Sequence, residues 1–183
     1  IYWSFTTTLV KTGLDGKVAL KAETRGGLEE GFDYDLKLDS ELRAYPAALV
    51  NLSGNGTAEQ VTVESLTIET LGGLIEGRGD LAWAPDLAWT LKLDADDLDP
   101  GRYDETLAGR VAFTADSSGG LAQGFSFSVK GNAALNEYPP AALDIVGTGT
   151  ADAATIDSLV IELLGGRIDG DAEIAWVPET RWD

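Results

Sequence analysis

The sequence predicts an all-β protein, folded as one elongated, curled β-sheet with a hydrophobic interior and built from two repeats of about 93 residues. Three observations predict this fold class. A long stretch of the chain is repeated 93 positions later, apolar and polar residues alternate with a period of two, and the apolar side has the same character in both copies.

The internal repeat is best seen in the stretch LTIETLGGLIEGRGDLAWAPDLAW, Leu66 to Trp89, which returns as LVIELLGGRIDGDAEIAWVPETRW, Leu159 to Trp182. An offset of 93 aligns residues 14–90 with 107–183 without a gap, and 33 of the 77 positions are identical. Such a period is typical of repeat proteins, whose units bury their apolar faces against their neighbours. We therefore expect one continuous segment, residues 1–183, with repeat 1 at about 1–93 and repeat 2 at about 94–183. Because the repeat is cut at both ends, we interpret the chain as a piece of a longer protein.

The first strands are predicted from alternation over residues 17–23 and 32–42, separated by a turn at Gly26-Gly27. In the second run one side is charged and the other almost fully apolar. Tyr45-Pro46 breaks the pattern, because proline cannot donate to a strand ladder. Gly54 and Gly56 then interrupt the pattern before two short alternating runs, 61–63 and 66–71. The phase of the apolar alternation changes between these runs, at Glu64-Ser65.

Gly72-Gly73 is predicted to form a hairpin turn, followed by alternation over residues 75–83 and, after Pro85-Asp86, over residues 89–95. The second copy repeats this plan, so we expect five or six strands per unit. Glycines within strands, such as Gly77, Gly79 and Gly131, would permit the sheet to bend. We expect the apolar side of both copies to line one trough, formed by Val18, Leu20, Phe32, Tyr34, Leu36, Leu38, Leu66, Ile68, Ile75, Leu81, Trp83, Trp89, Leu91, Leu93, Val111, Phe113, Phe125, Phe127, Val129, Leu135, Leu159, Ile161, Ile168, Ile174 and Trp176.

A two-layer sandwich, in which a second sheet covers each apolar face, is the competing fold. The aromatic residues argue for a continuous trough instead, since they recur at matching places: Phe32 with Phe125, Tyr34 with Phe127, and Trp83 with Trp176.

Composition narrows the classes of function. The net charge of -18 argues against nucleic acid and against docking on an anionic membrane surface. Cysteine and histidine are both absent, which excludes disulfides, thiolate nucleophiles and every site that needs imidazole. We expect no catalytic residues, no metal and no cofactor. The carboxylates of Asp94, Asp96, Asp97 and Asp99 crowd together, but they do not match the spacing of an EF-hand loop.

A family resemblance rests on the stretch LDPGRYDETLAGRV, Leu98 to Val111, together with ELRAYPAAL, SGNGTAE, LTIETLGG and GRGDLAW in this order. These segments resemble the repeats of the TamB family, in the AsmA-like group of bridge-like lipid transfer proteins, and the resemblance covers nearly the whole chain. The sequence departs from the family pattern at Thr106-Leu107-Ala108 and at Asn136-Glu137, which concerns the turns and not the apolar sides.

The resemblance implies a taco-shaped β-sheet whose interior shields phospholipid acyl chains during transport between membranes. It also implies a parent protein in the periplasm of a Gram-negative bacterium, anchored in the inner membrane. An outer-membrane partner of the Omp85 type, TamA-like, would be met through regions outside this segment, which itself would not insert into a membrane.

Two other functions stay open on the sequence. One is a scaffold or chaperone for outer-membrane or autotransporter proteins, which would pair their strands with exposed sheet edges. The other is a secreted adhesive or structural repeat protein.

Overall fold

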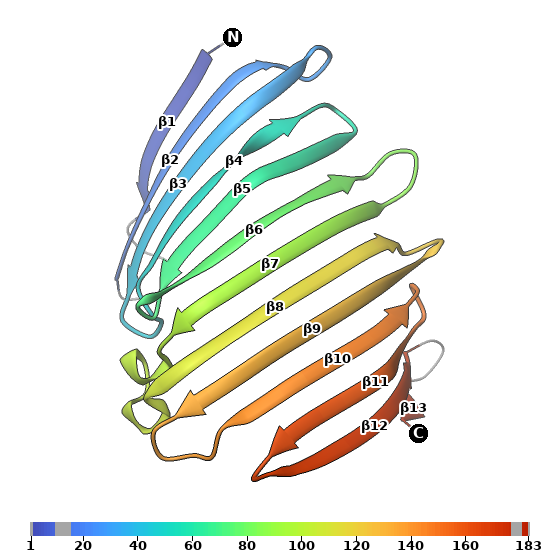
Figure 1. Ribbon diagram of the computed structural model, residues 1–183. Coiled ribbons are helices and arrows are strands. Elements are labelled where there is room, and N and C mark those ends of the chain that lie inside the picture. Colours follow the sequence, from blue (N-terminus) through green and yellow to red (C-terminus); the bar gives the residue numbers. More distant parts are fainter. Residues whose placement is uncertain (1, 10–15, 177–180, 183) are drawn as a thin grey trace.

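The computed structural model describes residues 2–9, 16–176 and 181–182, and it shows one sheet of 13 strands in which the spatial order equals the chain order (Figure 1). The elements are β1 (Tyr2–Leu9), β2 (Gly16–Gly27), β3 (Gly31–Leu42), β4 (Ala48–Gly56), β5 (Gln60–Thr70), β6 (Gly73–Ala82), β7 (Ala88–Leu98), η1 (Pro100–Arg102), η2 (Glu105–Leu107), β8 (Gly109–Gly120), β9 (Gly124–Leu135), β10 (Ala141–Gly149), β11 (Ala153–Leu163), β12 (Gly166–Ala175) and β13 (Arg181–Trp182). Every neighbouring pair is antiparallel. The all-β prediction is confirmed, and the strand orientation, which the sequence left open, is settled.

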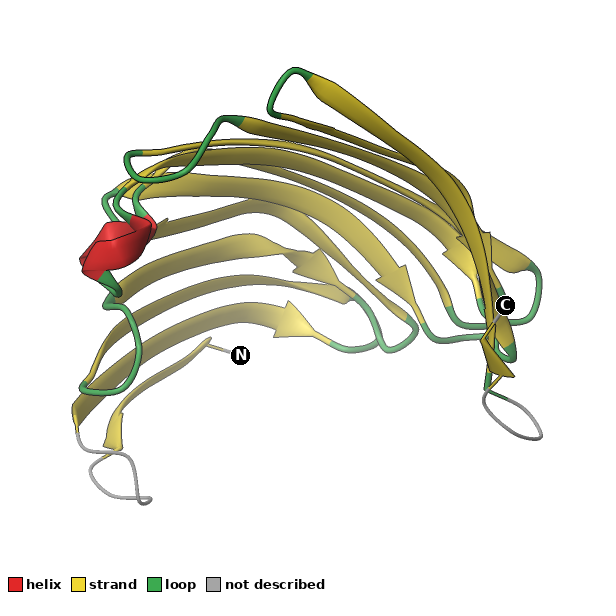
Figure 2. Cartoon of the chain, turned by 90° about the horizontal axis from the view of Figure 1, so that it is seen from below, coloured by secondary structure: helices red, strands yellow, loops and turns green. Residues whose placement is uncertain are grey.

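The sheet is a single curled layer, open along its length (Figure 2). Residues 2–9, 16–176 and 181–182 contain no second sheet that covers it, so the sandwich alternative is wrong. Among the described residues, only Ala95 and Leu98 are buried apolar residues, 2% and 6% exposed. Most other apolar side chains are half-buried, because they are shielded by neighbouring strands and by the curvature of the sheet rather than by another layer.

The turns alternate between two long rims, because each strand simply reverses the direction of the one before. We call one the tryptophan rim; it contains residues 28–30, 57–59, 83–87, 121–123, 150–152 and Trp176. The other, the tyrosine rim, contains residues 43–47, 71–72, 99–108, 136–140 and 164–165. Among the described residues no helix has the length and apolar character needed to cross a bilayer.

The backbone shows the repeat as clearly as the sequence does. Leu71 and Gly72 have φ values of 52° and 77°, and their counterparts Leu164 and Gly165 have 56° and 73°. Positive φ at both central residues defines the type I′ turn, which matches the twist of the two strands that it joins. The predicted hairpin is confirmed, with Leu71-Gly72 as its central pair.

Residues 60–70 form the single strand β5, where the sequence analysis expected two short runs, 61–63 and 66–71. The register of β5 shifts between Val63 and Leu66, and that of β11 shifts at the equivalent place, between Ile156 and Leu159. A β-bulge adds residues on one strand without ending its pairing. The change of phase at Glu64-Ser65 is therefore a bulge, and it returns Val63 and Leu66 to the same face.

Between the copies, the chain leaves β7, makes the turns η1 and η2, and enters β8, which pairs directly with β7. The Asp99 carboxylate accepts hydrogen bonds from the backbone N–H groups of Gly101 and Gly109, both at 3.0 Å. These two bonds lower the pKa of Asp99. The sheet thus continues from one copy to the next without interruption.

Candidate functional site: the concave apolar face

One face of the sheet is apolar across eleven strands. In antiparallel pairs, residues directly opposite each other project from the same face, so the register can be followed from strand to strand. From β2 to β12 it gives one row, which we call the central row: Ala22, Leu36, Leu52, Leu66, Gly77, Leu93, Ala115, Val129, Ile145, Leu159 and Gly170. At about 4.8 Å per strand, its ten steps span about 48 Å.

We call the face that carries the central row the apolar face. In β2–β12 no Asp, Glu, Lys or Arg occupies a paired position on it. The residues predicted to line the trough all project from this face, apart from Trp83 and Trp176, which lie just beyond the ends of β6 and β12. The structure therefore brings the predicted residues of both copies onto one continuous surface.

The opposite face carries the charges. The row next to the central row consists there of Lys21, Lys37, Asn51, Thr67, Glu76, Asp94, Thr114, Lys130, Asp144, Val160 and Asp169. Lys92 pairs with Asp116 at 3.0 Å, and Lys130 with Asp144 at 2.7 Å. A hollow on this charged face is lined by ionic and hydroxyl side chains, including Arg78, together with apolar ones such as Leu91 and Val146.

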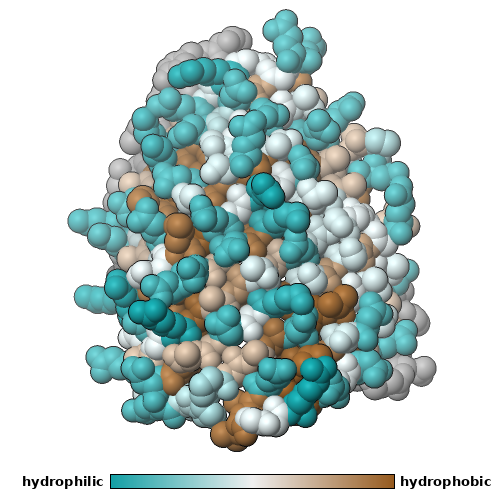
Figure 3. All heavy atoms as spheres, in the orientation of Figure 1, coloured by the Kyte–Doolittle hydropathy of each residue, from teal (hydrophilic) through white to brown (hydrophobic). Residues whose placement is uncertain are grey.

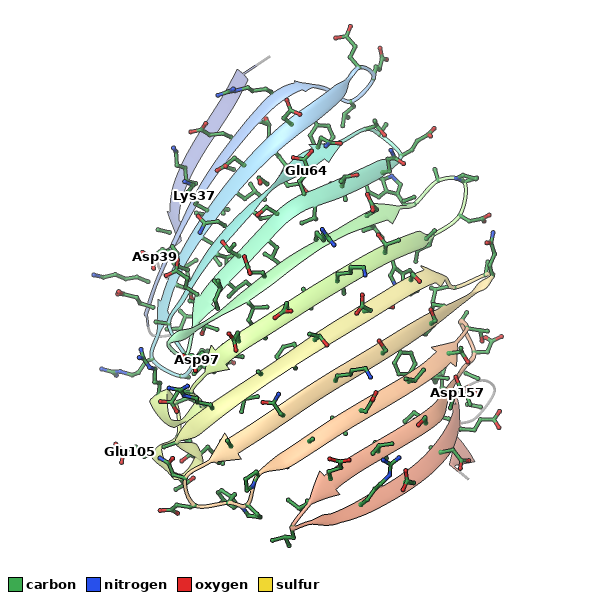
Figure 4. The ribbon with its side chains drawn as sticks, viewed as in Figure 1. Lys37, Asp39, Glu64, Asp97, Glu105 and Asp157 are labelled. Carbon is green, nitrogen blue, oxygen red and sulfur yellow. The ribbon has the colours of Figure 1, made fainter. Side chains whose placement is uncertain are left out.

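The charged face is convex and the apolar face is concave. Figure 2 shows the molecule from below, so that the side facing the viewer in Figure 1 is uppermost and forms the outside of the arch. Figure 3 shows that same outer side, and it is mainly hydrophilic. Lys37 and Asp39, labelled in Figure 4, belong to the charged face, because they alternate along β3 with Leu36 and Leu38, which project from the apolar face. The curl thus turns the apolar face inward.

Aromatic rings cover glycines of the neighbouring strand on the apolar face. A Cβ atom on Gly56 would lie 2.8 Å from Phe32 Cζ, and one on Gly54 would meet the backbone carbonyl oxygen of Thr62 and lie 2.7 Å from the Tyr34 hydroxyl oxygen. Such approaches are too close, so both positions require glycine. The second copy repeats the arrangement, with Phe125 over Gly149 and Phe127 over Gly147. The sequence analysis treated Gly54 and Gly56 as punctuation between strands, but they lie within β4 and make room for the rings.

Three polar side chains of the apolar face have hydrogen-bond partners. The Tyr34 hydroxyl donates to the Thr62 carbonyl oxygen at 2.9 Å, and Trp89 Nε1 donates to Ser117 Oγ at 2.9 Å. Ser117 Oγ donates in turn to the carbonyl oxygen of Ser126 at 3.1 Å. Burial raises the pKa of Tyr34, with a further contribution from the charge of Glu64, so the phenol stays neutral. These groups add little polarity to the surface.

Trp83 and Trp176 lie on the tryptophan rim and not within the strands, where the sequence analysis placed them. Trp83 Nε1 donates to the carbonyl oxygen of Ala58 at 2.8 Å, and Trp176 Nε1 to that of Ala151 at 2.7 Å. The two tryptophans remain 46% and 41% exposed. Each indole is thus held in the same position, at the lip of the concave face.

The acidic stretch that follows Leu93 does not form a metal site. Asp97 forms an ion pair with Arg110 at 3.2 Å, while the carboxylate of Asp99 is bonded to the backbone of the turn. In the part of the chain that the structure describes, no three Asp or Glu side chains gather as ligands would. The described carboxylates of Asp97 and Asp99 are thus taken up by an ion pair and by the turn.

Comparison with known proteins agrees with the repeat, because one family model matches the chain twice. The family model described as "TamB, N-terminal domain" matches residues 17–124 and 112–183. No curated protein and no solved structure matches the chain.

Proposed function

This chain belongs to the TamB family, and from that premise we propose that its concave apolar face shields the acyl chains of phospholipids while they pass between the inner and outer membranes. Proteins of this family span the bacterial periplasm and take part in lipid and outer-membrane assembly. In this proposal the segment is a non-enzymatic conduit, and contacts with a TamA-like partner in the outer membrane are made by other regions of the parent protein.

The observation that carries the proposal is the absence of charged residues from every paired position of the concave face, β2 to β12. In a water-soluble protein an uncharged apolar surface of this extent costs free energy unless something covers it. Here no second layer covers it, and the central row runs through both copies. A hydrocarbon ligand supplies the missing cover.

The energetics favour this ligand. Two acyl tails contain roughly 30 methylenes, and exposing each to water costs about 0.8 kcal/mol, which amounts to on the order of 20 kcal/mol per lipid. A tail that moves from Leu36 to Leu93 along the central row exchanges one apolar contact for another. The barrier to movement is therefore set by local roughness and not by transfer into water, and no catalytic group is needed.

Lipid-specific photo-crosslinking tests the proposal in the full-length protein. A photo-reactive amino acid is introduced at Leu93 or Phe127, on the concave face, and at their neighbours Asp94 or Ser128, on the convex face. We expect phospholipid adducts from the first pair and few from the second. Each comparison shifts the probe by one residue, which reverses the face without changing the strand.

Equal lipid adducts from both faces, or none from the concave one, would refute the conduit. Adducts to outer-membrane proteins, concentrated at the edge strands, would instead support the scaffold function, in which an edge strand pairs with a client strand.

A further inference from the structure

The two rims differ in charge. On the tryptophan rim, the turns that the structure describes contain Glu29, Glu30, Glu59, Asp86 and Asp152, and no Lys or Arg. The tyrosine rim has basic as well as acidic residues, among them Arg43 and Arg102. A charged group at the lip of the concave face therefore meets only acidic charged residues in the described turns of the tryptophan rim, whereas the tyrosine rim presents both signs of charge.

Each copy places a tryptophan opposite a carboxylate residue on this anionic edge. The backbone N–H of Trp83 donates to the Glu59 carbonyl oxygen at 3.0 Å, and that of Trp176 to the Asp152 carbonyl oxygen at 3.1 Å. The pairs are 93 positions apart, and in each the indole is held by its own hydrogen bond to the preceding turn. Glu59 and Asp152 are exposed.

The two pairs continue the apolar face to its lip. Val61 lies opposite Leu81 in the register of β5 and β6, and Ala154 lies opposite Ile174 in that of β11 and β12. Two residues further out, the same rows reach Glu59 with Trp83, and Asp152 with Trp176. These carboxylates are thus the first charged residues met on leaving the concave face at these two places.

We infer that the tryptophan rim holds the headgroups of zwitterionic aminophospholipids, with the ammonium group at the Trp83–Glu59 and Trp176–Asp152 pairs. This inference rests on the proposed function, because it places the tails on the concave face. An indole ring attracts a cation through its quadrupole, and a carboxylate pairs with it electrostatically. Phosphatidylglycerol has a net negative headgroup without an ammonium group, so it gains nothing from these pairs and the acidic residues of the rim repel it.

Competition binding to the purified full-length protein tests this inference. A fluorescent fatty acid that binds through its tail alone reports occupancy, and dihexanoyl phosphatidylethanolamine or dihexanoyl phosphatidylglycerol displaces it. We expect phosphatidylethanolamine to displace the probe at about tenfold lower concentration, a preference that shrinks as salt increases. In the double variant E59Q/D152N the preference should fall to about twofold or less.

A matched control is the double variant E69Q/E162Q. It removes two carboxylates that are also 93 residues apart, but these project from the convex face, where Glu69 lies opposite Leu74 and Glu162 opposite Arg167. This control should keep the full preference for phosphatidylethanolamine. It separates an effect of the rim pairs from an effect of the net charge.

The outcomes separate the two proposals. If the fatty-acid probe does not bind, the conduit itself is refuted. If the probe binds but both lipids displace it equally, the conduit stands and the headgroup inference fails. The headgroup inference also fails if E59Q/D152N keeps the preference for phosphatidylethanolamine. It fails likewise if the control E69Q/E162Q loses this preference to the same extent.

Discussion

Substitution of Leu93 by aspartate should block the passage of lipid while leaving the sheet folded. Leu93 lies at the middle of the central row, opposite Gly77 on one side and Ala115 on the other. A Cβ atom on Gly77 would lie 2.7 Å from Leu93 Cδ2, so the leucine side chain covers that glycine. Neither neighbour has a side chain long enough to shield a carboxylate introduced at this position.

The size of the effect follows from two possible costs. If the carboxylate keeps its water, about three methylenes of each tail must pass a hydrated group, which costs about 5 kcal/mol at 0.8 kcal/mol per methylene. If it loses its water, a carboxylate in a hydrocarbon environment costs about 3 kcal/mol. The cheaper route sets the barrier, so transport should slow by about 100-fold. The loss of stability should be only about 1 to 2 kcal/mol, because Leu93 is only partly buried.

The assay measures the arrival of radiolabelled phospholipid in the outer membrane of cells whose only copy of the full-length protein is the variant. The control is T114D, which adds the same charge to the convex face, between Asp94 and Lys130. T114D should transport normally. Transport by L93D within about threefold of the parent, at equal abundance, would show that tails do not follow the central row.

Three further predictions concern stability and are measured by denaturant unfolding. Gly54→Ala should destabilise the protein by about 1 to 3 kcal/mol, because the new methyl group meets the backbone carbonyl oxygen of Thr62 and the Tyr34 hydroxyl, whereas Gly170→Ala, where a Cβ has open space, should change the stability by less than about 1 kcal/mol. Equal effects would contradict the conclusion that Gly54 is required by the close approach of these atoms. Asp99→Asn should destabilise the protein at neutral pH. The pKa of Asp99 is lowered in the folded state, so its contribution is fully present above the unfolded pKa of about 4, decreases below that pH and is lost as the pH falls through the folded pKa. If the difference in the free energy of unfolding between the parent and the variant grows as the pH falls, the sign of this prediction is wrong. Tyr34→Phe should cost about 1 kcal/mol, since it deletes one hydrogen bond, while Phe127→Tyr at the equivalent position should be neutral or stabilising; an unchanged unfolding midpoint for Tyr34→Phe would show that the hydroxyl contributes nothing.

The sequence by itself determined which residues share a face. Alternation in 32–42 separated Leu36 and Leu38 from Lys37 and Asp39, and the register of β3 places them as predicted. The period of 93 predicted that the second copy would follow the same plan, and the matching turns at Leu71 and Leu164 follow it. These features are local, because a strand's side chains alternate whatever its partners are.

The tertiary structure decided what depends on partners far along the chain. A single curled layer and a sandwich both satisfy the same alternation, and only the register and curvature distinguish them. The bulge after Val63 keeps Leu66 in line with Leu52, which a change of phase in the sequence could not reveal. Gly54 under Tyr34 and Trp83 beside Glu59 are likewise contacts across strands. Alternation assigns a residue to one side of its own strand, but a continuous row exists only where every pair of strands is in register, and this is set by long-range pairing.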